Sequence, residues 1–347
     1  MRILALTSKY SGVGYHRIMM PLVNMPKDYC LITDVINDEV LEHKFDLVIL
    51  NRMLSHPVSE IEAWRDKYRF KLVVDNDDHW QLDPSHILNQ SYKDNNVTNR
   101  ILSYIEIADL CTCTHDRLAT EIYEVNKSVE IIPNAIPYGE EQFQDNKIES
   151  KLVRFFWSGS GTHERDLEIL RFPMKRINFP IKTVIAGYND GEKPVWDKMI
   201  VAFTNGLKLN PIIYNFNEVT KYMAAYADSD VSIIPLLDTS FNRMKSNLKI
   251  LETAAKHNPA IVSNVHPYKD MPVCYVNSQK DWYKWIKLLT YDEAARLEYG
   301  EKLFEYCNKH FNLHDVNKQR SAIYNKLMTG AVHTEDSEYL YHKEDLK

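Results

Sequence analysis

The chain has few cysteines, few glycines and no long apolar run. Its 347 residues include five cysteines and ten glycines. No two cysteines form a C-x-x-C pair, so we expect reduced thiols, no cysteine metal site and a cytoplasmic protein. No apolar stretch reaches the 18 residues that predict a membrane-spanning helix. The first residues read as a strand and turn polar too soon for a secretory signal.

Acidic side chains are in excess, but the excess lies in the first half of the chain. The net charge is −6. Residues 1–145 carry 14 Lys and Arg against 23 Asp and Glu, whereas residues 146–330 carry 26 against 20. The second half is therefore better suited to an anionic ligand, and the acidic first half disfavours a polyanionic partner such as DNA.

Apolar runs of strand length alternate with helical patterns, which predicts an α/β protein with parallel sheets covered on both faces. This alternation of strands and helices occurs twice along the chain, and the chain length fits two doubly wound domains facing each other across a cleft. A polar segment at 137–150 reads as the linker, giving domains at 1–145 and 151–314. A helix at 315–328 and a mobile tail at 329–347 complete the prediction. The predicted strands are 3–7, 47–51, 71–75, 110–114, 129–132, 153–157, 182–186, 212–214, 231–235 and 260–263.

The most informative segment is 242–255, a basic loop that follows an apolar strand and opens a helix. Loop amides and a helix N-terminus attract an anion, and Lys245 adds a charge that suits a phosphate. Glu252, one to two turns into the helix, can accept hydrogen bonds from a sugar hydroxyl. The alternative interpretation is a solvated loop and a capped helix.

Two further loops join a strand to a helix with small residues. Gly12 and Gly14 follow the first strand, where backbone amides can approach an anion. As a dinucleotide fingerprint this loop lacks its third glycine, so a nicotinamide dehydrogenase is a poor match. Residues 158–162 form a similar loop after the first strand of the second half. Either loop can instead be a simple turn with a helix cap.

Three carboxylates, Asp75, Asp77 and Asp78, cluster at the end of the third predicted strand. Such groups repel one another unless they are paired or solvated. They can orient an acceptor hydroxyl or act as a base, and we take Asp77 and Asp78 as the catalytic candidates. A divalent metal on the D-x-D pattern is a weaker alternative, as is a helix cap.

Taken together, these stretches resemble the GT-B nucleotide-sugar glycosyltransferases, nearest to the retaining group 1 type. The resemblance covers about residues 1–327. It rests on the loop at 11–17, on 73–80, on 131–136 and on 157–167. The strongest matches are 228–236, 241–255 and 259–264.

The resemblance implies a nucleotide-diphosphate sugar as donor, held by the second domain, with no metal or other cofactor required. The acceptor is a hydroxyl, on a glycan in the main interpretation. The implied donor-binding residues are Ser158, Gly159, Ser160, Arg243, Lys245, Ser246, Asn247, Leu248 and Glu252. Gly12, Gly14, His16 and Arg17 of the first domain would close the cleft.

One departure from the family pattern bears on stereochemistry. Many retaining members carry two glutamates eight positions apart, and Glu252 fits the second, but Met244 stands at the first. Inverting chemistry would make Asp77 or Asp78 the base, and retaining chemistry would leave them to position the acceptor. Two alternatives stay open: a phage-like DNA glycosyltransferase acting on hydroxymethylated bases, and a non-catalytic nucleotide-sugar-binding protein.

Overall fold

The computed structural model describes residues 1–8, 11–25 and 29–330, which form two compact units. The first unit comprises Met1–Leu82, Gln90–Asn134 and the chain from His314 onward. The second comprises Ala135–Leu313 and a short excursion, Asp83–Asn89, whose neighbours in sequence belong to the first unit. The polar segment 137–150 thus lies within the second unit. Residues 331–347 of the predicted tail lie outside the described residues.

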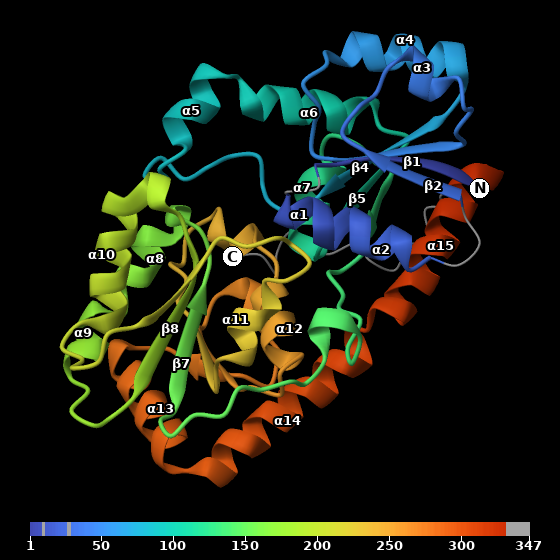
Figure 1. Cartoon of the computed structure of the whole chain (residues 1–347). Coiled ribbons are helices and arrows are strands. Elements are labelled where there is room, and N and C mark those ends of the chain that lie inside the picture. The colour runs from blue at the N-terminus through green and yellow to red at the C-terminus, as the bar shows by residue number, and fades with distance from the viewer. Residues whose placement is uncertain (9–10, 26–28, 331–347) are drawn as a thin grey trace. The chain divides into compact units, whose positions relative to one another are not determined.

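The first unit contains a parallel sheet in the order β2-β1-β3-β4-β5-β6 (Figure 1). Its strands in the described chain are β1 Arg2–Leu6, β2 Tyr29–Thr33, β3 Leu47–Asn51, β4 Lys71–Asn76, β5 Leu110–Cys113 and β6 Val129–Ile131. Its helical segments are α1 Gly12–Gly14, η1 Tyr15–Met19, α2 Met20–Val23, α3 Asp38–Leu41, α4 Val58–Tyr68, α5 Asn89–Asp94, α6 Val97–Ile107, α7 Asp116–Tyr123 and α15 Leu313–Thr329.

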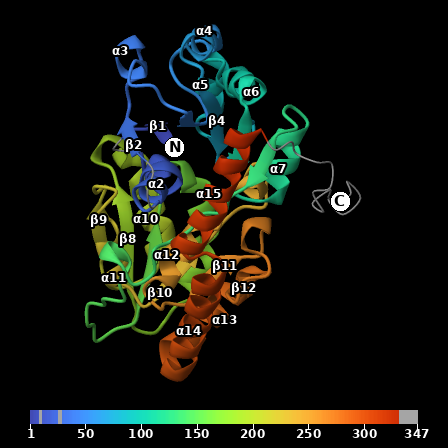
Figure 2. The ribbon, with the colours of Figure 1, turned by 90° about the vertical axis from the view of Figure 1, so that its right-hand side faces the viewer.

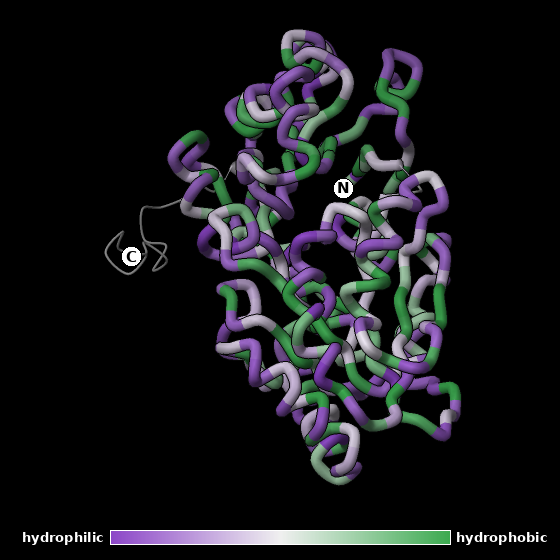
Figure 3. Tube along the Cα trace, turned by 90° about the vertical axis from the view of Figure 1, so that its left-hand side faces the viewer, coloured by the Kyte–Doolittle hydropathy of each residue, from purple (hydrophilic) through white to green (hydrophobic). Residues whose placement is uncertain are grey.

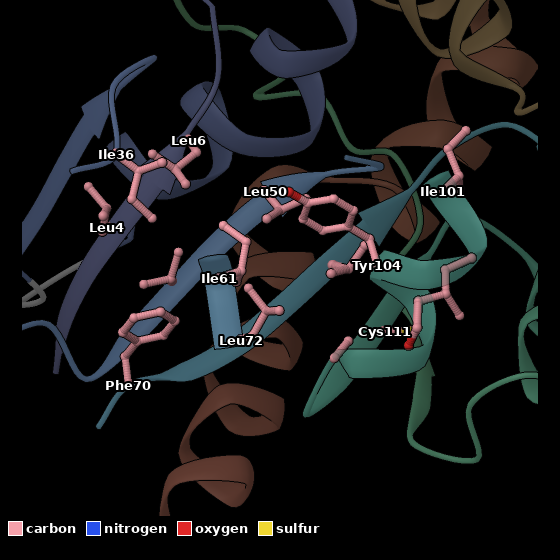
Figure 4. Packing of buried hydrophobic residues seen from close by; sticks show 14 of the residues in the cluster. Leu4, Leu6, Ile36, Leu50, Ile61, Phe70, Leu72, Ile101, Tyr104 and Cys111 are labelled. Carbon is pink, nitrogen blue, oxygen red and sulfur yellow. Dashed lines mark hydrogen bonds between the residues drawn. The ribbon is translucent and has the colours of Figure 1, made fainter. Parts of the chain in front are cut away.

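Alternate residues of the first sheet bury themselves under α4 and α6. Figure 4 shows Leu4, Leu50 and Leu72 from neighbouring strands beside Ile61 of α4 and Tyr104 of α6. All five are almost fully buried. Successive strand residues point to opposite faces, so the intervening residues face the other side of the sheet. The near-continuous apolar strands follow from burial of both faces.

Helix α15 lies along the first unit beside α2 (Figure 2). The Asn317 side chain donates to the Pro21 carbonyl oxygen at 2.9 Å, and Gln319 donates to the Ile131 carbonyl oxygen at 3.0 Å. Asn317 is buried, so its hydrogen bond fixes the helix against α2 in a site without access to water. The last helix of the described chain is thereby part of the first unit.

The second unit contains a parallel sheet in the order β12-β11-β10-β7-β8-β9. Its strands in the described chain are β7 Arg154–Ser158, β8 Lys182–Tyr188, β9 Ile212–Asn215, β10 Val231–Ile234, β11 Ala260–Ser263 and β12 Cys274–Val276. Its helical segments are η2 Glu141–Phe143, η3 Gly161–His163, α8 Glu164–Glu168, α9 Arg171–Lys175, η4 Asp190–Glu192, α10 Lys193–Thr204, α11 Met223–Ala227, η5 Asn242–Met244, α12 Leu248–Ala254, η6 His266–Tyr268, α13 Gln279–Tyr291 and α14 Glu293–His310.

Helices cover both faces of the second sheet. Helices α8, α9, α10 and α13 contact one another on one face, and α11, α12 and α14 do so on the other. Trp157 of β7 packs edge-on against Trp196 of α10, and both rings are fully buried. Figure 3 shows hydrophobic and hydrophilic residues alternating along the tube.

The α/β class with two doubly wound parallel sheets is confirmed. All ten predicted strands are present, displaced by at most two residues at an end. The sequence analysis missed β2 and β12, which are outermost strands of their sheets. Among the helices of residues 1–8, 11–25 and 29–330, none combines the length and the apolar character needed to cross a bilayer.

Candidate functional site

The second sheet has a topological switch point between β7 and β10, because the strands that follow them extend to opposite edges. In open α/β sheets, ligands bind at such a point, outside the carboxyl ends of the strands. The loop after β7 leads into η3 there, and the loop after β10 leads into η5. These are two of the loops to which the sequence analysis assigned the donor.

A cavity of about 260 Å³ opens at this switch point. The loop after β7 and the start of α8 form one wall, and the loop after β10 forms another. The excursion Asp83–Asn89 forms the third wall of the cavity. The lining residues are Asp83, Ser85, His86, Ile87, Gly161, Thr162, His163, Glu164, Arg165, Asp166, Leu237, Thr239, Phe241, Asn242 and Lys245.

The buried carboxylate of Asp166 joins the two loops of the cavity. One oxygen accepts from the Leu237 backbone amide at 2.9 Å and from Asn242 Nδ2 at 3.2 Å. The other lies 2.8 Å from His163 Nδ1. Burial raises the pKa of Asp166, but the hydrogen bonds from His163 and Leu237 outweigh it and hold that pKa below its usual value. Asp166 therefore stays charged and fixes the shape of the cavity.

Lys245 lines the cavity, with its Nζ 5.0 Å from the centre of the Phe241 ring. Arg243, which was expected beside it, has a different position. Its guanidinium donates to both oxygens of Asp238, at 2.6 and 3.0 Å, on the surface. Arg243 is not among the residues that line the cavity. Asp238 neutralises this arginine locally, so it adds little positive charge at the switch point.

Ser158 and Glu252 are brought together through a tyrosine. Ser158 Oγ lies 2.8 Å from the Tyr226 hydroxyl, which donates to one oxygen of Glu252 at 2.5 Å. The other oxygen accepts from Tyr222 at 2.7 Å. Glu252 is only 6% exposed, so these phenols supply hydrogen bonds that the buried carboxylate needs.

Gly159 lies against the neighbouring loop without room for a side chain. A Cβ on Gly159 would come within 2.8 Å of the Trp157 ring. Gly187, at φ +98°, approaches the Gly159 carbonyl oxygen so closely that a Cβ there would lie 2.0 Å from it. The Trp157 side chain thus accounts for Gly159, and the close approach of the backbone accounts for Gly187. Ser160 Oγ is 2.7 Å from the Thr162 hydroxyl.

The remaining predicted donor residues are Ser246, Asn247 and Leu248, at the entry to α12. Asn247 Nδ2 lies 3.7 Å from the Met271 sulfur, and its side chain does not cap the helix. Helix α12 has only seven residues. Its dipole is therefore a weaker source of positive potential than the sequence analysis assumed, and the lysine side chains matter more.

In the first unit, Arg17 and Asp75 form a buried ion pair at the carboxyl end of β4. Arg17 donates to both Asp75 oxygens, at 2.7 and 3.0 Å, and also to the Ile132 carbonyl oxygen. Thr112 Oγ1 adds a hydrogen bond to Asp75 at 2.7 Å. The guanidinium of Arg17 is thus engaged within its own unit, which differs from the expected place at a donor. Asp75 is likewise occupied, which disfavours a metal on D-x-D.

Asp77 lies beside this pair and is partly buried. Asn51 Nδ2 donates to it at 3.3 Å. Burial, followed by repulsion from Asp78, raises the pKa of Asp77 to about 6, against the opposing attraction of Arg52. A carboxylate with that pKa can accept a proton near neutral pH. Within the described ranges, no group of three or more His, Cys, Asp or Glu is placed to hold a metal ion.

The loop after β1 is shaped by packing within the first unit. Ser11 Oγ accepts from the Gly14 amide at 2.9 Å, and a Cβ on Gly14 would lie 1.8 Å from Thr7 Oγ1. No described atom comes within 4 Å of a Cβ built on Gly12. His16 is buried, with its ring edge-on to Tyr15. The close contact with Thr7 therefore requires a glycine at position 14, and this requirement is independent of the role of Gly12.

Comparison with known proteins finds structures similar to that of this chain, although the sequences are not similar. No model of a known protein family matches the chain, and no curated protein matches it. Sucrose-phosphate synthase from Thermosynechococcus elongatus superimposes with a TM-score of 0.67 at 13% identity, over 95% of this chain and 100% of that one.

Two further structures are similar to the same extent. HepE from Anabaena, solved in complex with UDP-glucose, gives a TM-score of 0.68 at 11% identity, over 94% of this chain and 100% of that one. A glycosyltransferase from Rickettsia africae gives 0.65 at 12% identity, over 94% and 98%. The chain therefore has the GT-B fold expected from the resemblance.

Proposed function

We propose that the protein is a glycosyltransferase that moves a sugar from a nucleotide-diphosphate sugar to a hydroxyl acceptor. The observation that carries this proposal is the cavity at the β7–β10 switch point, with Lys245 in its wall. The fold is the one in which HepE holds UDP-glucose. A cavity of about 260 Å³ can admit part of such a ligand, in the manner of pre-formed small-molecule sites.

The proposed roles follow the chemistry of each group. Lys245 contacts the diphosphate, where a charge-assisted hydrogen bond stabilises the leaving group. Glu252, held by its two tyrosines, accepts from a sugar hydroxyl, and Ser158–Ser160 border the donor. Asp77 or Asp78 accepts the proton of the acceptor hydroxyl or positions it.

Some predicted residues take supporting roles in this proposal. Arg17 holds the Asp75 carboxylate and the end of β4 in position. Gly14 and His16 shape the loop after β1. Gly12 remains a candidate for backbone contact with the donor. The acceptor is proposed to be a glycan hydroxyl. The described residues offer no observation that favours the DNA-modifying alternative.

Substitution of Lys245 by alanine tests the donor site. We expect nucleoside-diphosphate affinity to fall by about tenfold to hundredfold, because hydrogen bonds to charged groups contribute about 1.5–3 kcal/mol. Isothermal titration with UDP, GDP and ADP measures this loss after a thermal-shift screen has chosen the tightest ligand.

The matched control is Lys302→Ala, which removes an exposed lysine of α14 that pairs with Glu298. Its affinity should equal that of the wild type. Equal affinity in Lys245→Ala would refute the assignment of Lys245. Slow hydrolysis of the bound nucleotide sugar by the wild type separates an enzyme from the non-catalytic alternative, which would bind the donor and leave it intact.

A further inference from the structure

Lys249 is the second residue of α12, four positions after Lys245, and it contacts a residue of the donor cavity. Its Nζ is 3.5 Å from His163 Nε2, and His163 lines the cavity. The same ammonium group lies 5.4 Å from the centre of the buried Trp157 ring. A cation over an indole face and beside an imidazole nitrogen has a defined position, although the lysine stem is flexible. Lys249 had no role in the sequence analysis.

His163 is held in one orientation by the carboxylate beneath it. Its Nδ1 lies 2.8 Å from Asp166, which the Leu237 amide and Asn242 fix in turn. A charged carboxylate accepts, so Nδ1 carries the proton and Nε2 presents its lone pair to Lys249. Burial, then Lys249 and Lys245, lowers the pKa of His163 to about 3, so the ring is neutral at physiological pH. A neutral imidazole accepts from the ammonium group without repelling it.

The charges around this histidine favour an anion. Lys245 lines the cavity, and the Lys249 ammonium group lies 3.5 Å from Nε2 of His163, which lines it as well. Asp166 provides one compensating negative charge, which is directed at His163 and Asn242. Arg243 is already matched by Asp238. The cavity lining also holds Glu164, which pairs with Lys198 at 3.1 Å, and Asp83, which lies within the electrostatic reach of Arg165. With these charges compensated, Lys245 and Lys249 exceed Asp166 by one positive charge at the switch point.

We infer that Lys249 is a second phosphate-binding cation of the donor cavity, and that the His163–Asp166 pair positions its ammonium group. This inference rests on the proposed function and deepens it. The ligand class is a diphosphate, because two ammonium groups at one cavity can each bind one of its phosphoryl groups. Lys249 thereby takes the place that the sequence analysis gave to Arg243.

Binding of inorganic pyrophosphate and of UDP to the full chain, measured by titration calorimetry, tests the inference. We expect Lys249→Met to weaken both ligands by at least tenfold. Lys249→Arg, which keeps the charge, should weaken them less. Lys302→Met is the matched control and should bind as the wild type does.

Two histidine variants test the positioning role without removing a charge. His163→Leu removes the acceptor and should weaken pyrophosphate severalfold, whereas His163→Gln keeps an oxygen near the Nε2 position and should retain most of the affinity. A merely structural role would lower the melting temperatures of both variants without separating their affinities. Thermal unfolding of each variant provides that comparison.

The outcomes separate the two claims. Wild-type binding that Lys249→Met leaves unchanged, with the melting temperature preserved, overturns the inference and leaves the proposed donor site standing. Equal affinities for His163→Leu and His163→Gln overturn the positioning role. Absence of wild-type binding to pyrophosphate and to every nucleoside diphosphate at millimolar concentration overturns the proposed function and the inference with it.

Discussion

Replacement of Asp77 by asparagine is expected to lower turnover by about 10²–10⁴-fold while it stabilises the protein at neutral pH. General bases contribute roughly that factor to a proton-transfer step. Asparagine keeps the size of the side chain and its contact with Asn51, but it cannot take a proton. Donor affinity should change little, because Asp77 belongs to the first unit and the donor cavity to the second.

The stabilisation follows from the direction of the pKa shift. In the folded protein the pKa of Asp77 is about 6, above the ordinary aspartate value of 3.8. Its contribution to stability is therefore fully present below pH 3.8 and is lost as the pH rises through 6. Above that pH the partly buried charge costs on the order of 1–2 kcal/mol, which asparagine removes. Thermal unfolding at pH 5 and pH 8 should show a larger gain at pH 8 than at pH 5.

The pH dependence of turnover distinguishes Asp77 from Asp78. With Asp77 as base, kcat/KM rises as the pH passes through about 6 and is level above it. Asp78→Asn removes the neighbouring charge that raises the pKa of Asp77, so the rise should move to lower pH while most activity persists. An Asp77→Asn enzyme with near-normal turnover, or an unmoved profile in Asp78→Asn, would exclude this assignment.

Replacement of Arg17 by methionine is expected to destabilise the first unit by about 3–5 kcal/mol, because it leaves the Asp75 carboxylate buried without its partner. Both side chains are less than a tenth exposed, and Arg17 provides four hydrogen bonds to the ends of β4 and β6 and to Asn134. Urea unfolding followed by circular dichroism measures the loss.

A surface pair provides the control for Arg17. Arg171 and Glu168 form an exposed ion pair on the second unit, and Arg171→Met should leave the stability close to that of the wild type. The double variant Arg17→Met, Asp75→Leu removes both buried charges and should recover part of the loss. A single Arg17→Met variant as stable as the control would show that solvent reaches Asp75.

The fold was predictable because its strands are buried on both faces and therefore read as apolar runs. Strand β2, Tyr29–Thr33, is a short apolar edge strand that was missed because it follows a proline-containing segment that reads as a loop. Strand β12 has only three residues and is likewise the outermost strand of its sheet. Edge strands need fewer apolar residues than central strands, so their pattern is weaker.

The loops that form the candidate site were predictable from the sequence, but the side-chain contacts within the site were not. The strand-to-helix loops and Lys245 follow from local sequence, whereas the pairing of Arg243 with Asp238 depends on how the surface loop turns. His163 and Asp166 are three positions apart at the start of a helix, a spacing that brings side chains together. That spacing was a usable signal. The convergence of Lys249 on His163, 86 positions away, was not visible in the sequence.

The excursion Asp83–Asn89 has a consequence for domain exchange. Asp83, Ser85, His86 and Ile87 line the donor cavity. A chimaera that receives only residues 135–313 would therefore contain the second sheet, Lys245 and Lys249, but it would lack the cavity wall that these four residues form. Its recipient would complete the cavity with its own residues. Donor preference in such hybrids should therefore depend on a seven-residue insert as well as on the transplanted domain, and grafting that insert is the smallest exchange that would restore the parental preference.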